Sequence, residues 1–283
     1  MATAIDERLI LGLVLGIFGS MFLNVGKGVQ KQKVQVLKQG RKMFSAAHRK
    51  DFLIWLLGIL MTIAAAGFYS ASLKFTDRSS LVSSLSGIGL VGLLLYAWLV
   101  LKESIGFREI FSSALIILGT GMVSYFNQSL GQEQKYQLSH FIYVSLFLGA
   151  VFGVMAYAGA KVPKFWGLAF GVIAGSLIGL AIILGDMALV RSGGSMLRQF
   201  QNPYVYLALF ASTSALALTQ VAFFKGSAVQ VVPTINSFII LTPLLVEYFT
   251  FGVRLNLAQY LGVAVVVFGI ALLTTSPRQV FRN

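Results

Sequence analysis

The sequence contains no cysteine, few charged residues and very few acidic ones. Of its 283 residues, 11% are charged, and Asp and Glu together number nine. The absence of cysteine excludes disulfides, thiolate nucleophiles and thiolate metal sites. The two histidines, His48 and His140, leave little material for a histidine metal site. A soluble domain carries about a quarter charged residues, so this chain cannot form an ordinary water-facing surface.

The sequence instead contains long hydrophobic runs. About 20 helical residues cross a hydrocarbon core of about 30 Å, so a run of 18 or more is a candidate transmembrane helix. We expect an all-α integral membrane protein of about nine transmembrane helices, without a soluble domain. The predicted spans are 9–26, 52–74, 79–101, 105–126, 140–160, 167–190, 203–224, 228–251 and 257–275.

One connection is strongly basic. Residues 27–51 hold eight of the 22 Lys and Arg residues, with apolar residues among them, as in an amphipathic segment at a membrane surface. With this loop in the cytoplasm, the cytoplasmic loops hold 15 basic residues and the opposite side holds seven. The positive-inside rule then predicts a protein of the cytoplasmic (inner or plasma) membrane, with its N-terminus outside and its C-terminus inside.

The chain also matches itself without gaps at an offset of 150 residues. Segment 79–121 aligns with 229–271, so that Glu103 faces Val253 and Gly119 faces Gly269. The second, third and fourth spans therefore repeat as the seventh, eighth and ninth. Five crossings separate each pair, and an odd number inverts the second copy in the membrane, as in many secondary transporters.

We therefore divide the single membrane domain into two repeats. Residues 1–126 form a four-helix repeat that includes the basic loop, and residues 127–283 form a five-helix repeat. A weaker match of 26–31 to 159–164 pairs the first span with the fifth and leaves the sixth without a partner. We expect no additional crossing in the basic loop, because a Lys or Arg at a helix centre costs roughly 3 kcal/mol.

The two copies resemble the EamA-type halves of the drug/metabolite transporter superfamily. The stretches that carry the resemblance begin FYSASLKFTDRSSLVSSLSGIG and TQVAFFKGSAVQVVPTINSFII. The N-terminal LGLVLGIFGSMFLNVGKGVQK, followed by a polar loop, is similar to the NIPA branch, whose members have nine spans and are described as magnesium transporters. Two departures are Val253 where the family has glutamate, and Ala-Ala-Ala-Gly at 64–67 where that branch has a Gly-Glu pair.

Polar groups within spans are functional candidates by default, because they are costly in lipid. In the eighth span, Asn236, Pro243 and Glu247 share one helical face, which we interpret as substrate-facing. Alternatively, the prolines shape helix packing and the polar groups bond to neighbouring helices. Further candidate substrate contacts are Ser237, Ser83, Ser84, Asn24, Tyr69 and Gln220. Small hydroxyl residues such as Ser83 and Ser84 equally suit close helix packing.

Few carboxylates are available to bind a coupling ion or proton. Glu247 is the preferred candidate, and Asp186 is the second, with an interfacial pairing to Arg191 as its alternative role. Glu103 and Glu109 are expected to form structural ion pairs with Lys102 and Arg108. Candidate contacts to lipid head groups are Lys31, Lys33, Lys38 and Arg41.

The leading hypothesis is a secondary transporter that moves a small polar or amphipathic solute by alternating access. The alternatives are a NIPA-like magnesium transporter and a flippase for lipids or lipid-linked sugars. Mg²⁺ needs one or two carboxylates, which would require Asp186 and Glu247 to approach each other. A lipid flippase would need a lateral opening and could use the basic segment to hold anionic head groups.

Other classes of protein are not supported by the motifs. There is no HExxH motif, no close pair of intramembrane acids and no nucleophile–base arrangement, so we expect no enzyme activity and no cofactor. The basic residues report membrane topology, and no soluble fold presents them to nucleic acid. The expected partners are a small-molecule or cation substrate and membrane lipids, with the chain acting as a monomer or homodimer.

Overall fold

The structure is a computed structural model that describes residues 7–76, 85–126, 137–192, 198, 200–250, 252 and 254–275, a few of them by backbone alone. Over these residues the chain is helical and contains no strand. Its elements are α1 (Glu7–Lys33), η1 (Val34–Phe44), α2 (Arg49–Thr76), η2 (Leu85–Gly87), α4 (Gly89–Leu99), α5 (Phe107–Tyr125), α6 (Leu138–Lys161), η3 (Pro163–Phe165), α7 (Trp166–Arg191), α9 (Pro203–Lys225), α10 (Ala228–Thr250) and α11 (Leu257–Thr275).

Seven helices are long and apolar enough to cross a membrane: those of α1, α2, α5, α6, α7, α9 and α10. The helix α4 and the segment Leu257–Leu273 of α11 are apolar but shorter than the length needed for a span. The bundle exposes large apolar side chains on its outside, such as Phe210 and Val154, which are 73% and 69% exposed. Extensive apolar surface of this kind suits contact with lipid, and the chain has the character of an integral membrane protein.

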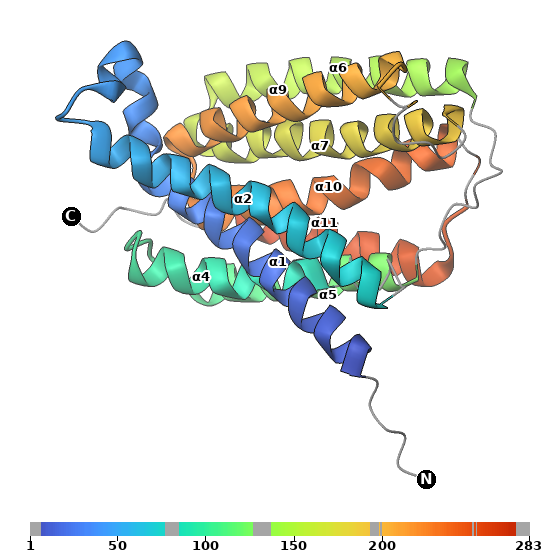
Figure 1. The fold of residues 1–283 in the computed structure, drawn as a ribbon, viewed down its shortest axis with the longest axis horizontal. Helices are drawn as coiled ribbons and strands as arrows, with labels where there is room; N and C mark the ends of the chain where they lie inside the picture. Colours follow the sequence, from blue (N-terminus) through green and yellow to red (C-terminus); the bar gives the residue numbers. More distant parts are fainter. Residues whose placement is uncertain are drawn as a thin grey trace, which may run out of the picture.

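The helices lie in groups around α10 (Figure 1). On one side α6, α7 and α9 run alongside one another, and on the other side lie α4 and α5, with α1 and α2 crossing in front. The most extensive packing is between α1 and α2, between α7 and α9, between α5 and α11, and between α7 and α10. Because α10 also contacts α1, α4 and α5, it is the central helix of the bundle.

The first helix differs from the sequence-based prediction. It does not end at residue 26 but continues to Lys33, so part of the predicted basic loop belongs to a helix inside the bundle. Glycines allow this helix to lie close to α2: a Cβ at Gly58 would lie 2.7 Å from the backbone oxygen of Gly26. Lys27 and Lys31 are buried in this last part of α1, with 4% and 9% of their surfaces exposed.

The packing also favours a different pairing of helices from the one expected. The helix α1 packs on α2 and α4, and α7 packs on α9 and α10 in the same way. Since α2 aligns with α9 and α4 with α10 at the 150-residue offset, the packing matches α1 with α7. The helix without a partner is then α6, and the weak match of 26–31 to 159–164 does not correspond to equivalent packing.

The helices α5 and α11 cross at glycines. A Cβ at Gly119 would lie 2.7 Å from the Gly262 backbone oxygen and 2.7 Å from Val266. A Cβ at Gly269 would lie 3.0 Å from the Ser112 backbone oxygen and 2.9 Å from Ile116. Lower numbers on α5 meet higher numbers on α11, so the two helices run antiparallel at this crossing. Small residues at such a crossing let two backbones pack closely in a membrane.

This crossing predicts opposite effects for two glycine substitutions on α5. Gly119→Ala should lower the thermal unfolding midpoint in mild detergent, because the new Cβ meets backbone and costs about 1–3 kcal/mol. Gly121→Ala is the matched control, since a Cβ there meets nothing within 4 Å. The control should be neutral or stabilising, as alanine has the higher helix propensity. Equal stability of the two variants would contradict the close crossing.

Candidate functional site

A chain of polar side chains crosses the interface between α1 and α10. The Lys27 amine donates to Asn236 Oδ1 at 2.8 Å, and the Asn236 amide donates to Asn24 Oδ1. The Asn24 amide in turn donates to the backbone oxygen of Ser20 at 2.9 Å. Asn24 and Lys27 face α10 together because they are three residues apart on a helix. Two of the predicted substrate contacts, Asn24 and Asn236, are therefore in direct contact.

A second group of amides lies one turn further along α1. Gln220 of α9 donates to Gln30 Oε1 at 2.8 Å and accepts a hydrogen bond of 2.9 Å from the Trp55 indole. Gln30 donates to the Thr62 hydroxyl at 2.8 Å and to the backbone oxygen of Gly58. Gln30 and Gln220 are buried. These bonds join α1, α2 and α9, and they satisfy amides that would be costly if left unpaired.

The next polar group towards the end of α1 contains a charge pair. The Lys31 amine donates to the Phe223 backbone oxygen at 2.6 Å and interacts electrostatically with Glu103. Glu103 lies in the connection between α4 and α5 and accepts from the backbone N–H groups of Ala228 and Val229, at the start of α10. A carboxylate is favourable there, because the first N–H groups of a helix lack intrahelical partners.

Two opposing influences act on the Glu103 carboxyl. Burial raises its pKa, while the two backbone N–H donors and the Lys31 charge oppose that shift. The expectation that Glu103 pairs with Lys102 or Arg108 was wrong, because its contacts are to α1 and α10. Glu109 accepts from the backbone N–H of Gly106 at 2.9 Å and caps the start of α5, and its expected ion pair stays a prediction.

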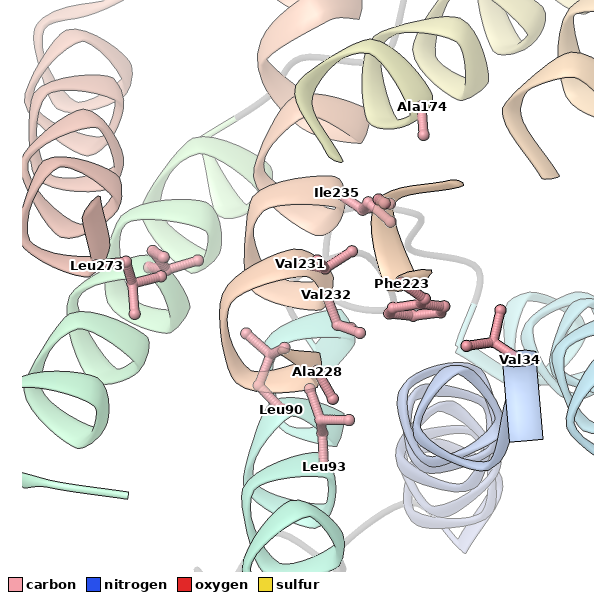
Figure 2. Close-up of a cluster of buried hydrophobic side chains, with 12 residues drawn as sticks. Val34, Leu90, Leu93, Ala174, Phe223, Ala228, Val231, Val232, Ile235 and Leu273 are labelled. Atoms are coloured by element: carbon pink, nitrogen blue, oxygen red, sulfur yellow. The ribbon is translucent and has the colours of Figure 1, made fainter. Parts of the chain in front are cut away.

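An apolar cluster packs around the start of α10 and beside these polar groups. Figure 2 shows side chains from several elements in this cluster, among them Val34, Phe223, Ala228 and Val232. Each of these four is at most 1% exposed. Polar groups beside such packing have little contact with bulk water in this conformation, so their hydrogen bonds and charges must largely be balanced locally.

The other predicted contacts occupy different surroundings. The Ser237 hydroxyl donates to the Pro233 backbone oxygen on the same helix. Pro243 packs against Gly179 of α7, and the Tyr69 ring packs against Gly19 of α1. Glu247 is buried near the far end of α10, 11 residues after Asn236 and thus about 16 Å along the helix axis. The structure does not place Glu247 in the polar chain around Asn236.

Three predicted residues lie outside what the structure describes. Ser83 and Ser84 fall in the stretch before η2, and the Asp186 side chain is also not described. The approach of Asp186 to Glu247, which the magnesium hypothesis requires, therefore stays a prediction. Among the described side chains, no group of three or more His, Cys, Asp or Glu residues could share a metal ion.

The four predicted lipid-contacting residues lie in three different surroundings. Lys31 is buried in the bundle, so its assignment to lipid head groups was wrong in this conformation. Lys33 forms an ion pair with Asp51, with 2.7 Å between nitrogen and oxygen. Lys38 and Arg41 are exposed on η1, where Lys38 lies over the Phe224 ring. Lys38 and Arg41 therefore remain candidates for head-group contact.

Sequence reasoning missed Lys27, which belongs to the polar chain, and also Gln30 and Trp55, which belong to the second group of polar side chains. Asn24, Lys27 and Lys31 follow one another at steps of three and four residues, which is the signature of one helical face. That pattern was not used, since the first span was ended at residue 26 and residues 27–51 were interpreted as a basic amphipathic segment at the membrane surface. The missing information was the set of partners on α9 and α10, which the sequence does not display.

Searches against protein-family models, curated proteins and solved structures each returned no match to this chain. The functional inference therefore depends on the geometry. The site offers two buried amines, several amides and hydroxyls, and a carboxylate that already caps a helix. This set of groups suits non-covalent binding of a polar solute, since binding sites are built from a few convergent polar groups within an apolar lining.

The amide chain predicts a non-additive double mutant. Gln30→Leu and Gln220→Leu should each lower the unfolding free energy by about 1–3 kcal/mol, because each leaves buried polar partners unsatisfied. The double variant should cost less than the sum of the two, since the shared bond is lost only once. Thermal unfolding in detergent measures all three.

Exposed Gln39 supplies the control, Gln39→Leu, which should change stability little. Trp55 emission should change in Gln220→Leu, because the indole loses its acceptor, and should stay unchanged in the control. Strictly additive effects would show that Gln30 and Gln220 are not bonded to each other.

Proposed function

We propose that the chain is a secondary transporter that moves a small polar or amphipathic solute by alternating access between two halves of inverted topology. The observation that carries the proposal is the crossing of α5 and α11. Shifting Gly119, Gly262 and Val266 by 150 residues gives Gly269, Ser112 and Ile116, which make the same contacts. An interface in which each residue meets the equivalents of its own partners is isologous and implies a twofold axis.

The direction of the two helices indicates how this axis lies. A twofold axis along the membrane normal would relate parallel helices, whereas α5 and α11 are antiparallel at their crossing. The axis is therefore perpendicular to the helices and, for helices that cross the bilayer, lies in the membrane plane. Such an axis is typical of transporters built from inverted repeats, with the substrate site near the interface of the repeats.

Local backbone features support the same repeat. Lys102 and Gly252, which are 150 residues apart, both have positive φ, at 56° and 70°. The Glu109 carboxylate accepts from the Gly106 backbone N–H, and the Gln259 side chain accepts from the Asn256 backbone N–H. Both pairs occur at the same offset. Such agreement in turn geometry and helix capping favours a duplicated unit over chance similarity of apolar sequence.

The position of the polar chain supports a substrate site between the halves. Lys27 and Asn24 belong to α1 in the first half, and Asn236 belongs to α10 in the second. Separation of these helices would expose the polar groups, and closure would rejoin them. In the proposed orientation, which follows from the positive-inside rule, the basic end of α1 and the start of α10 lie on the cytoplasmic side and the N-terminus lies outside.

The magnesium alternative finds little support in this site. The Lys27 ammonium lies beside the candidate contacts Asn24 and Asn236, and a like charge opposes entry of a divalent cation. The flippase alternative has one observation in its favour. A largely apolar cavity of about 570 Å³ lies between α6, α7, α10 and α11, with exposed Tyr248 and Tyr260 in its lining. An acyl chain or an amphipathic solute would fit such a lining.

Alternating access predicts that the polar chain is reachable from both sides of the membrane. The chain has no cysteine, so a single introduced thiol reports alone. Asn24→Cys should react with membrane-impermeant thiol reagents in both right-side-out and inside-out vesicles. Ile63→Cys, at an α2 position that is 64% exposed on the outer face of the bundle, is the control and should react from neither side. Reaction of Asn24→Cys from one side alone would contradict alternation.

Transport itself should depend on Asn236. A thermal-shift screen against divalent cations, amino acids, nucleotides and lipid-linked sugars identifies a ligand, and flux of that ligand into proteoliposomes is then measured. Asn236→Ala should abolish flux while the protein still folds, with an unfolding midpoint lowered by the loss of its bonds to Lys27 and Asn24. Glu247→Ala should also abolish flux if Glu247 couples transport. Unimpaired flux in both variants would exclude this site assignment. Fluorescent-lipid flipping without solute flux would favour the flippase.

A further inference from the structure

The charge of Lys27 has no counter-charge in the described structure. Its side chain is 4% exposed, and its hydrogen-bond acceptor is Asn236 Oδ1, a neutral oxygen. No carboxylate of the described residues lies within ion-pair distance of the Lys27 amine. Lys33, six residues further along α1, does form an ion pair, with Asp51. An ammonium group has three N–H donors, so two of them are left without an acceptor. Buried charges are normally paired, so the Lys27 charge would be stabilised by an anionic partner.

The neighbouring lysine shows how the same helix treats a structural cation. Lys31 lies one turn away, bonds the Phe223 backbone oxygen and interacts with the Glu103 carboxylate. The Glu103 carboxylate is itself held by the N–H groups of Ala228 and Val229. Within the described part of the chain, the fold thus neutralises Lys31 with an internal acid and supplies none for Lys27. A purely structural lysine at position 27 would leave this difference unexplained.

The surroundings of Lys27 provide further donors and, beyond the end of α1, further positive charge. Asn24 and Asn236 place two amides beside the amine. Lys27 lies six residues before the end of α1, about 9 Å from that end at 1.5 Å per residue. Beyond this end, η1 carries exposed Lys38, Arg41 and Lys42. Clustered basic groups of this kind raise the local concentration of anions at the end of α1.

We propose that Lys27, together with the amides of Asn24 and Asn236, binds an oxyanion, and that the transported solute carries a carboxylate or phosphate group. The proposal names a substrate class for the transporter function proposed above. The claim that the bound oxyanion is transported rests on that function. In the closed conformation Asn236 Oδ1 accepts from the ammonium in place of the solute. An arriving oxyanion replaces that oxygen and occupies the free donors, and charge neutralisation stabilises the bound state.

The test uses the purified full-length chain in nanodiscs of zwitterionic lipid, with inorganic phosphate and succinate as probes at constant ionic strength. Glucose, putrescine and Mg²⁺ are the neutral and cationic comparisons. At least one oxyanion should raise the unfolding midpoint, and the comparisons should not. Lys27→Met should weaken oxyanion binding more than about tenfold, because a buried charge partner is lost. Lys27→Arg, which keeps the charge, should retain part of the binding.

A matched control separates this site from general surface charge. Lys42 is exposed at the same end of the molecule, and Lys42→Met removes one positive charge without touching the polar chain. Its oxyanion affinity should stay within about twofold of the parent chain, as expected for an exposed charge. The ligand-free midpoint is a second readout: Lys27→Met should equal or exceed the parent, because an uncompensated buried charge is replaced by an apolar chain of similar volume.

Several outcomes would overturn the proposal. These are the absence of stabilisation by either oxyanion, equal binding by the parent and Lys27→Met, and a lower ligand-free midpoint in Lys27→Met, which would mark Lys27 as a structural group. Nanodiscs with anionic lipid distinguish the source of the phosphate. A loss of the phosphate response with a Lys27-dependent rise in midpoint would assign the site to a lipid head group and overturn transport of a free solute.

Flux measurements distinguish the loss of oxyanion binding from the absence of transport. Lys27-dependent oxyanion binding without flux into proteoliposomes would retain the binding site and reject transport. Flux of a neutral or cationic solute that Lys27→Met leaves unchanged would retain transport and reject the oxyanion. Oxyanion flux that is lost in Lys27→Met and kept in Lys42→Met is the result expected if both hold.

Discussion

The need to satisfy buried polar groups on α1 determines how the two halves of this bundle meet. The final turns of α1 carry Lys27, Gln30 and Lys31 into an apolar interior, where each unpaired group is costly. Their partners come from α2, α9, α10 and the α4–α5 connection. These contacts fix the depth and rotation of α1, since a shift of one residue would turn all three side chains away from their partners.

The glycine crossing of α5 and α11 supplies the second constraint. It brings two backbones together with few polar contacts, through shape alone, and it lies on the proposed twofold axis. The polar chain lies away from this crossing, between α1 and α10. A tightly packed, symmetric contact beside an asymmetric polar interface suits the proposed alternating access, in which two halves rock about one region while another opens.

The sequence was most informative where the pattern was purely apolar. Seven of the nine hydrophobic runs correspond, over the described residues, to helices long and apolar enough to cross a membrane, and the predicted span 257–275 has the bounds of α11. It was least informative where a local cost is offset by distant partners. Lys27 and Lys31 were assigned to a surface loop because a lysine in a span is costly, and nothing nearby in the sequence announces Asn236 or Glu103. Asn24, Asn236 and Gln220 were correctly chosen as polar groups, but Gln30 and Trp55 emerge only when α1, α2 and α9 are packed.

Divergence between the two proposed repeats would explain why the polar chain occurs once and not twice. Asn236 on α10 corresponds to Ser86 at the 150-residue offset, Glu103 corresponds to Val253, and α7, which packs as α1 does, contains no lysine. The first half therefore contributes the cations and the second half the amide that meets them. Duplication would supply one helix of the α5–α11 crossing to each half. Recognition of an anionic solute, in contrast, needs a single charge at one place. A second buried lysine related by symmetry would add repulsion and desolvation cost without adding a contact, so specificity of this kind favours asymmetric side chains on a symmetric backbone.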